Sequence, residues 1–201
     1  MNTLYLSTTS PYTRILLMIA KSEQVDLALN FVMPWENPTE LTTINSFSQV
    51  PALVLQTGET ITETPLIIQA IAPQLYVKHA HDLPQMAKAF GILAQGVRAF
   101  SLQRFALEGQ DAHPLVDRSI KLLKDTLPKL PILSANAPSL ADKVLLCALI
   151  WIGIRLPQVF ETLSDANQQA VYEFHQSPLM QKLNADSLES KPSKVSDIMI
   201  E

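Results

Sequence analysis

The pattern of apolar and polar positions predicts two kinds of structure along the chain. Short apolar runs of strand length alternate with helical patterns over roughly the first 75 residues, whereas only helical patterns follow. The predicted strands cover residues 4–6, 27–33, 52–55 and 59–62, and the last two flank a Thr-Gly turn that is typical of a hairpin. The chain therefore combines an α/β part with an all-α part.

Two helices in the α/β part are predicted to begin at a hydroxyl residue followed by proline. Ser10 precedes Pro11, and Thr64 precedes Pro65. Serine and threonine are favoured N-caps, and proline is favoured at the first helical position. With a weaker helical signal over 39–44, the predicted order of elements is β-α-β-α-β-β-α.

The second part of the chain predicts a set of helices. They cover residues 83–109, 114–129, a segment that opens at 138–142, 167–174 and 178–184. The most apolar stretch, 144–154, is shorter than the roughly twenty residues that a membrane span requires, so we expect a buried central helix. Ser139 and Asp142 have the spacing of a capping box. Residues 187–201 are expected to form a loosely ordered tail.

Composition excludes several classes of function. The 201 residues are 47% hydrophobic and 17% charged, which suits a packed core, and the net charge of -4 without a basic cluster argues against nucleic-acid binding. The single cysteine, Cys147, excludes an intrachain disulfide, Cys-x-x-Cys redox chemistry and a cysteine-based zinc site. We find no secretory signal and expect a cytosolic protein that does not enter a membrane. His79 and His81 suggest a metal site only weakly, because no second cluster completes it, and we predict no metal.

Four local motifs resemble those of the cytosolic glutathione transferases. They are Ser-Pro-Tyr-Thr-Arg at 10–14, Gln-Val-Pro-Ala-Leu at 49–53, Ile-Thr-Glu-Thr at 61–64 and Ser-Leu-Ala-Asp at 139–142. Each motif is common, but all four occur in the family's order over nearly the whole chain. Lys-Ser-Glu-Gln at 21–24 replaces the family's usual Lys-Gly, which indicates a divergent, bacterial-like member of the serine type.

The resemblance implies the glutathione transferase fold. Residues 1–76 would form a thioredoxin-like, glutathione-binding domain, and residues 83–201 an all-helical C-terminal domain. It also implies a homodimer, formed through the helix after Thr64 and the long helix after Asp82. A cis peptide bond is expected between Val50 and Pro51.

Ser10 is the predicted catalytic residue. Conjugation of glutathione requires its thiolate, and a free thiol with a pKa near 8.5 is mostly protonated at neutral pH. A hydroxyl donor at a helix N-terminus stabilises the thiolate by its hydrogen bond and by the positive end of the helix dipole. A serine before a proline is otherwise only an N-cap, and Ser7, Thr8 and Thr9 are alternative donors.

The resemblance assigns the remaining contacts to glutathione. Glu63 would hold the γ-glutamyl ammonium, and Thr64 with free helix N–H groups its carboxylate. Val50, before Pro51, would pair its backbone with the cysteinyl part, and Gln49 would face the glycine end, where the usual positive residue is missing. Arg14 is expected either to support the site or to be an ordinary solvated residue of the first helix.

Three functions agree with these residues. The leading one is glutathione transfer to a small hydrophobic electrophile, as in detoxification, with glutathione as co-substrate; Phe90, Arg98, Phe105 and Tyr12 are expected near the acceptor. The second is a non-catalytic binding or regulatory protein of the same fold. The third, glutathione-dependent isomerisation, requires the same site.

Overall fold

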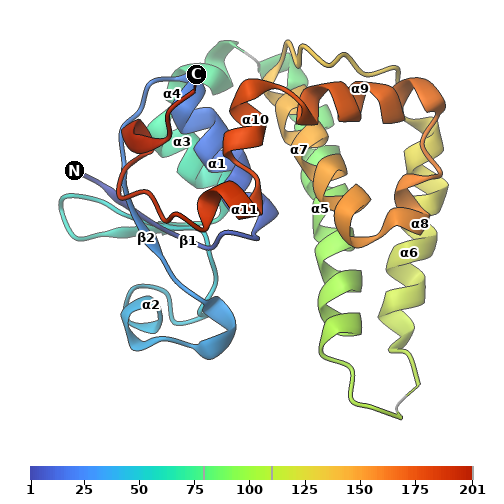
Figure 1. The fold of residues 1–201 in the computed structure, drawn as a ribbon, viewed down its shortest axis with the longest axis horizontal. Helices are drawn as coiled ribbons and strands as arrows, with labels where there is room; N and C mark the ends of the chain where they lie inside the picture. Colours follow the sequence, from blue (N-terminus) through green and yellow to red (C-terminus); the bar gives the residue numbers. More distant parts are fainter. Residues whose placement is uncertain (79, 110, 201) are drawn as a thin grey trace. The chain divides into compact units, whose positions relative to one another are not determined.

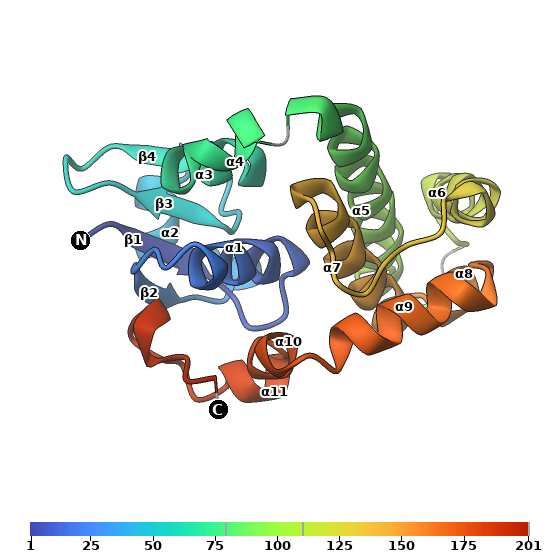
Figure 2. The ribbon, with the colours of Figure 1, turned by 90° about the horizontal axis from the view of Figure 1, so that it is seen from above.

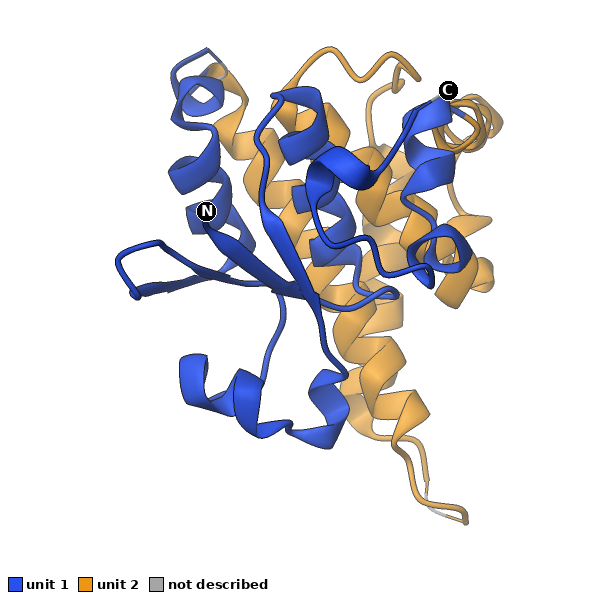
Figure 3. Ribbon diagram, turned by 60° about the vertical axis from the view of Figure 1, so that its left-hand side comes forward, with its two compact units in different colours: residues 1–80, 177–201 blue, residues 81–176 orange. Residues whose placement is uncertain are grey.

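The computed structural model of the chain has its strands near the N-terminus and is helical elsewhere (Figure 1, Figure 2). It describes residues 1–78, 80–109 and 111–200. The chain divides into two units, one of residues 1–80 and 177–201 and one of residues 81–176 (Figure 3). The four-stranded sheet lies in the first unit, which we call the sheet unit, and the second is the helical unit.

The sheet has the strand order β2-β1-β3-β4. Its strands are β1 (Thr3–Leu6), β2 (Ala28–Phe31), β3 (Ala52–Val54) and β4 (Thr60–Thr62). β1 pairs in parallel with β2 and antiparallel with β3, and β3 pairs antiparallel with β4. All four predicted strands are present, which confirms the β-α-β-α-β-β-α order, although β2 is shorter than the apolar run 27–33.

Helices lie on both faces of this sheet, with α1 and α3 on one face and α2 on the other (Figure 1). The helices and 3-10 turns of this region are α1 (Pro11–Ser22), η1 (Pro34–Glu36), α2 (Thr39–Ile44), α3 (Thr64–Ile71) and α4 (Pro73–Lys78). α1 is buried from Thr13 to Ala20 because it lies on the sheet beside α3 and is also in contact with the C-terminal residues 195–197. Ser10 and Pro11 begin α1 as predicted, with Ser10 as the N-cap.

The C-terminal residues pack on the sheet unit, so the expected loosely ordered tail is wrong. They form α10 (Pro178–Lys182), α11 (Ala185–Leu188) and η4 (Val195–Asp197). The Leu29 N–H donates to the Ser193 carbonyl at 2.8 Å and the Val195 N–H donates to the Leu27 carbonyl at 3.0 Å, which adds a short antiparallel partner to the outer edge of β2. Buried Val195 and Ile198 hold this segment in place, a pattern too short to stand out in a polar sequence.

The helical unit is built around α7 (Leu140–Arg155), whose residues are buried almost throughout. The other elements from residue 80 to 176 are η2 (Ala80–Asp82), α5 (Leu83–Arg104), α6 (Pro114–Thr126), η3 (Leu127–Lys129), α8 (Pro157–Phe160) and α9 (Asp165–His175). Cys147 is fully buried in α7, as its apolar surroundings in the sequence predicted. Within the described ranges, no helix combines the length and apolar character needed to cross a membrane.

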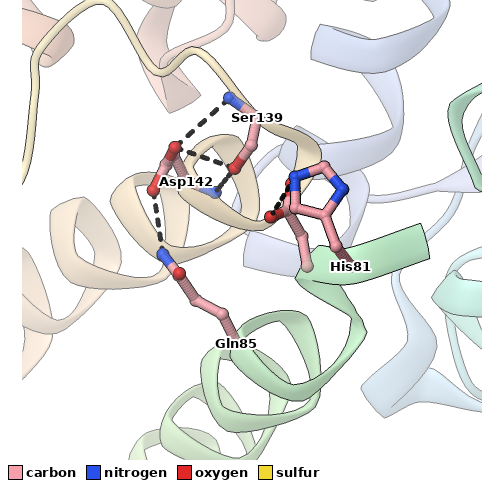
Figure 4. A network of polar contacts seen from close by, with 5 residues as sticks. His81, Gln85, Ser139 and Asp142 are labelled. Atoms are coloured by element: carbon pink, nitrogen blue, oxygen red, sulfur yellow. Dashed lines mark hydrogen bonds and ion pairs between the residues drawn. The ribbon is translucent and has the colours of Figure 1, made fainter. Parts of the chain in front are cut away.

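A polar network caps the start of α7 (Figure 4). The Ser139 Oγ accepts a hydrogen bond from the Asp142 N–H at 3.1 Å, and the Ser139 N–H donates to the Asp142 Oδ2 at 3.2 Å. Gln85, on α5, donates its Nε2–H to the Asp142 Oδ1 at 2.9 Å. The predicted capping box is therefore confirmed, and its carboxylate also connects α7 to α5.

Candidate functional site

Strand register brings the predicted site residues to one edge of the sheet. Tyr5 of β1 is paired with Ala52 of β3, which is paired with Thr62 of β4. The chain leaves β1 toward Ser10 at this edge, enters β3 from Val50 and Pro51, and leaves β4 toward Glu63. Three segments far apart in the sequence therefore converge where α1 and α3 begin.

Ser10 caps α1 with an oxygen lone pair, and this leaves its hydroxyl proton available as a donor. Its Oγ accepts a hydrogen bond from the Thr13 N–H at 3.3 Å, and its backbone is extended, as an N-cap requires. This bond uses one acceptor lone pair of the hydroxyl, which still has a proton to donate. Within the described part of the chain the Ser10 O–H has no acceptor. Capping α1 and donating to a thiolate are therefore compatible roles.

The three alternative hydroxyls are placed less favourably. Ser7 is buried, Thr8 donates its hydroxyl to the Glu189 carboxylate at 2.8 Å, and Thr9 is exposed on the turn. Among them Thr8 has its proton committed to an acceptor, and only Ser10 caps the helix. The burial of β1 alternates as predicted, with Leu4 and Leu6 buried and Tyr5 half-buried on the other face.

Val50 offers a backbone edge to a ligand. The Val50-Pro51 peptide bond is cis, as expected. Among the described residues, neither the N–H nor the C=O of Val50 has a hydrogen-bond partner, so both suit the addition of an extended peptide. Gln49 is exposed, and its carbonyl accepts from the Asn45 Nδ2–H at 2.9 Å. Asn45, which is buried, holds this loop and was not recognised from the sequence.

Glu63 is the N-cap of α3 and has a φ of 66°, a left-handed conformation that a glutamate rarely adopts. Such backbone strain is typical of ligand-binding positions. Its carbonyl accepts from the N–H groups of Leu66 and Ile67, both at 3.0 Å, while its exposed carboxylate makes no capping bond. Thr64 is buried beside it, and within the described ranges no acceptor faces the Thr64 N–H. A carboxylate and a helix-end N–H thus stand side by side.

Tyr12 lies in the electrostatic field of Glu63. Burial of the phenol raises the pKa of Tyr12 above its usual value, and the negative charge of Glu63 raises it further. The start of α1 and the start of α3 are therefore close enough for their side chains to interact. From the sequence we expected Tyr12 near the acceptor; its coupling to Glu63 depends on the fold and has no local signal.

Arg14 is not the solvated helix residue that one of the two expectations described. It is buried, not solvated, and its Nε–H donates to the Leu183 carbonyl at 2.9 Å. This bond ties α1 to the segment between α10 and α11, one turn after Ser10. Arg14 therefore helps to fix α1, and nothing in the local sequence distinguishes a buried arginine here from an exposed one. Its support of the site stays a prediction.

The helical unit contains an open hollow of about 500 Å³ between α7, α8 and α9. Ile154, Phe160 and Tyr172 are among its lining residues. None of the predicted site residues lies in it. In the same unit Arg98 and Phe105 are exposed and Phe90 is half-buried.

The histidines form no metal centre in the described residues. His79 lies outside them, and the His81 Nε2 is 3.1 Å from the Asp82 Oδ1. Over residues 1–78, 80–109 and 111–200, histidine, cysteine and acidic side chains nowhere gather in groups of three that could hold a metal ion.

Comparisons with known proteins agree with this geometry. Residues 9–74 match the family model of the glutathione S-transferase N-terminal domain. No curated protein sequence matches the chain.

Solved structures match over most of the chain. A glutathione transferase family member from Pseudomonas fluorescens Pf-5, with bound glutathione, has a TM-score of 0.70 at 22% identity and covers 92% of this chain and 98% of its own. A glutathione S-transferase from Methylobacillus flagellatus KT, with glutathione bound, has a TM-score of 0.64 at 20% identity and covers 92% of this chain and 99% of its own. A glutathione transferase homologue from Sulfitobacter, also with bound glutathione, has a TM-score of 0.62 at 19% identity and covers 95% of this chain and 97% of its own.

The chain therefore has the glutathione transferase fold, with a thioredoxin-like N-terminal region followed by helices. The resemblance stated from the four motifs is confirmed, by sequence over residues 9–74 and by fold over most of the chain.

Proposed function

We propose that the protein is a glutathione transferase that binds reduced glutathione in the sheet unit and transfers it to a small hydrophobic electrophile. The observation that carries this proposal is the convergence of Ser10, Val50 and Glu63 at one sheet edge through the pairing of β1, β3 and β4. Each segment supplies a different kind of contact, and together they match the chemical groups of γ-glutamylcysteinylglycine.

The proposed binding mode assigns one contact to each part of glutathione. The Glu63 carboxylate pairs with the γ-glutamyl ammonium, and the Thr64 N–H and hydroxyl donate to the γ-glutamyl carboxylate at the start of α3. The Val50 N–H and C=O pair with the cysteinyl backbone next to Pro51, and Gln49 faces the glycine end. The cysteinyl thiol then lies toward Ser10.

Ser10 acts on the sulfur in this proposal. The thiol releases its proton to solvent, and the Ser10 O–H donates a hydrogen bond to the thiolate. A charge-assisted bond of this kind contributes about 1.5–3 kcal/mol, and the α1 N-terminus adds about 0.3–1 kcal/mol. The sulfur lone pair then forms a bond with the electrophilic carbon, and the leaving group departs with its electron pair.

A non-catalytic binding protein of the same fold is the second candidate. It is favoured by the absence of any lysine, arginine or histidine between residues 22 and 77, where the glycine carboxylate of glutathione would need a cation. Glutathione-dependent isomerisation would use the same site. A homodimer formed through α3 and α5 stays a prediction.

Calorimetric titration of reduced glutathione into the protein, combined with thiolate absorbance near 240 nm, tests the proposal. Binding with a thiolate signal at neutral pH supports transfer chemistry. Binding without that signal favours the non-catalytic protein, and no heat at millimolar glutathione refutes the glutathione site.

A further inference from the structure

We propose that the preferred thiol ligand carries an uncharged or cationic group where reduced glutathione carries its glycine carboxylate. This inference rests on the proposed function, because it concerns the far end of the same site. The substrate class proposed for the site is a γ-glutamylcysteinyl thiol whose C-terminal carboxyl group is converted to an amide. The amide nitrogen can be that of ammonia or of a larger amine.

The strand order determines which segment receives that end. Moving from Glu63 past Val50 crosses from β4 to β3 and continues toward β1 and β2. An extended tripeptide is about 10 Å long, and two strand spacings, from β4 past β3 to β1, are about 9.6 Å. A ligand anchored at Glu63 and paired with Val50 therefore ends beyond β3 on the β1 side, next to loop 45–49, which leads into Val50, and to loop 33–36, which Ser48 ties to that loop.

These two loops are held together. The Ser48 hydroxyl donates to the Pro34 carbonyl at 3.0 Å. The Asn45 side chain donates to the Gln49 carbonyl at 2.9 Å and accepts from the Phe47 N–H at 3.1 Å. Residues 33–49 thus form one wall that leads directly to the unpaired backbone of Val50.

All charged side chains of this wall are carboxylates. Residues 22–77 carry no lysine, arginine or histidine, and their carboxylates are Glu23, Asp26, Glu36, Glu40, Glu59 and Glu63. Glu63 is assigned to the ligand ammonium, and Glu59 lies in the β3–β4 turn at the opposite end of the sheet. Glu36 and Glu40 are exposed on the wall itself. A glycine carboxylate arriving here meets like charges and no cation from this segment.

The wall also exposes apolar side chains. Met33 is 52% exposed, Trp35 54% and Phe47 80%. Apolar and aromatic side chains favour a neutral or cationic group over a carboxylate, and an indole face attracts cations in particular. Negative charge and apolar surface in the same seventeen-residue segment 33–49 therefore select against the free carboxyl end.

The affinities of two thiols for the full-length protein test this inference. The probes are reduced glutathione and its C-terminal amide, γ-glutamylcysteinylglycinamide, each titrated by calorimetry at low and at high salt. We expect the amide to bind roughly threefold to tenfold more tightly at low salt, with the ratio falling as salt screens the charges.

Three variants that each lose one negative charge locate the effect. Glu36→Gln and Glu40→Gln are each expected to reduce the preference for the amide, while Glu59→Gln, at the other end of the sheet, leaves it unchanged. Equal or tighter binding of reduced glutathione by the parent overturns the inference while leaving the proposed function intact. An equal response to Glu59→Gln overturns it as well, because the preference would then reflect overall charge. If neither thiol binds, the proposed function itself fails.

Discussion

Replacing Ser10 by alanine removes two contributions that can be measured separately. The Oγ accepts the Thr13 N–H at 3.3 Å and so caps α1, and its O–H is the proposed donor to the glutathione thiolate. The first contribution concerns folding stability and the second concerns the pKa of a bound thiol. A role as a simple helix cap predicts only the first.

The magnitudes follow from the two bonds. Losing a serine N-cap costs about 1 kcal/mol of unfolding free energy, within a range of about 0.5–2 kcal/mol. Losing a hydrogen bond to a thiolate costs about 1.5–3 kcal/mol, and about 1.4 kcal/mol corresponds to one pKa unit. We therefore expect Ser10→Ala to raise the pKa of bound glutathione by roughly one to two units and to lower conjugation at pH 7 by roughly tenfold.

Ser164 provides a matched control. It caps α9 in the helical unit, and its Oγ accepts the Asn167 N–H at 3.3 Å, the same distance as at Ser10. Ser164→Ala should lose a similar amount of stability in urea unfolding. It should leave the pH dependence of the thiolate absorbance near 240 nm unchanged, because Ser164 lies far along the chain and caps a different helix.

Two results would contradict the proposed role of Ser10. If Ser10→Ala binds glutathione with an unshifted thiol pKa, Ser10 is only a cap and another group activates the sulfur. If Ser164→Ala shifts that pKa as much as Ser10→Ala, the effect reports loss of stability and not loss of a donor. Ser10→Thr, which keeps a hydroxyl, should retain most of the thiolate signal.

The remaining predictions concern binding, stability and assembly. Glu63→Gln should weaken glutathione binding by tenfold or more in calorimetry, because a charge-assisted bond is lost. The same substitution should lower the pKa of Tyr12, measured by absorbance near 295 nm, only partly toward its usual value, because burial is the larger cause of the raised pKa. Arg14→Ala should lower the unfolding free energy in urea by about 1–3 kcal/mol, because a buried carbonyl loses its donor, whereas Arg98→Ala at an exposed position should change it little. Leu66→Glu, at a 54% exposed apolar position of α3, should convert the predicted homodimer to a monomer in sedimentation velocity, and an unchanged sedimentation coefficient would exclude α3 from any interface.

Much of the fold was predictable because it depends on local signals. Ser10 with Pro11 begins α1, and the capping box of Ser139 and Asp142 begins α7, since caps satisfy the free N–H groups of the first turn within three residues. The apolar run 144–154 predicted a buried helix, because a helix that is apolar on all sides has no face suited to solvent.

Contacts between residues far apart in the sequence could not be predicted from such local signals. The C-terminal residues carry few apolar side chains, yet Val195 pairs with Leu27 and is buried against the sheet unit. Arg14 could not be distinguished from a solvated residue, because its acceptor, the Leu183 carbonyl, is 169 positions away. Every residue carries a backbone carbonyl, so the sequence does not indicate which carbonyl will accept the hydrogen bond.

Local sequence was enough to identify the kinds of residue at the candidate site: a hydroxyl at a helix start, a Val-Pro strand entry and a glutamate before a second helix start. Their convergence depends on the folded sheet, because the pairing of Tyr5 with Ala52 and of Ala52 with Thr62 sets which strand ends lie together. Packing also sets that the Thr8 hydroxyl donates a hydrogen bond to the Glu189 carboxylate while the Ser10 hydroxyl donates to no described residue, since a hydrogen bond across 181 positions does not depend on neighbouring residues.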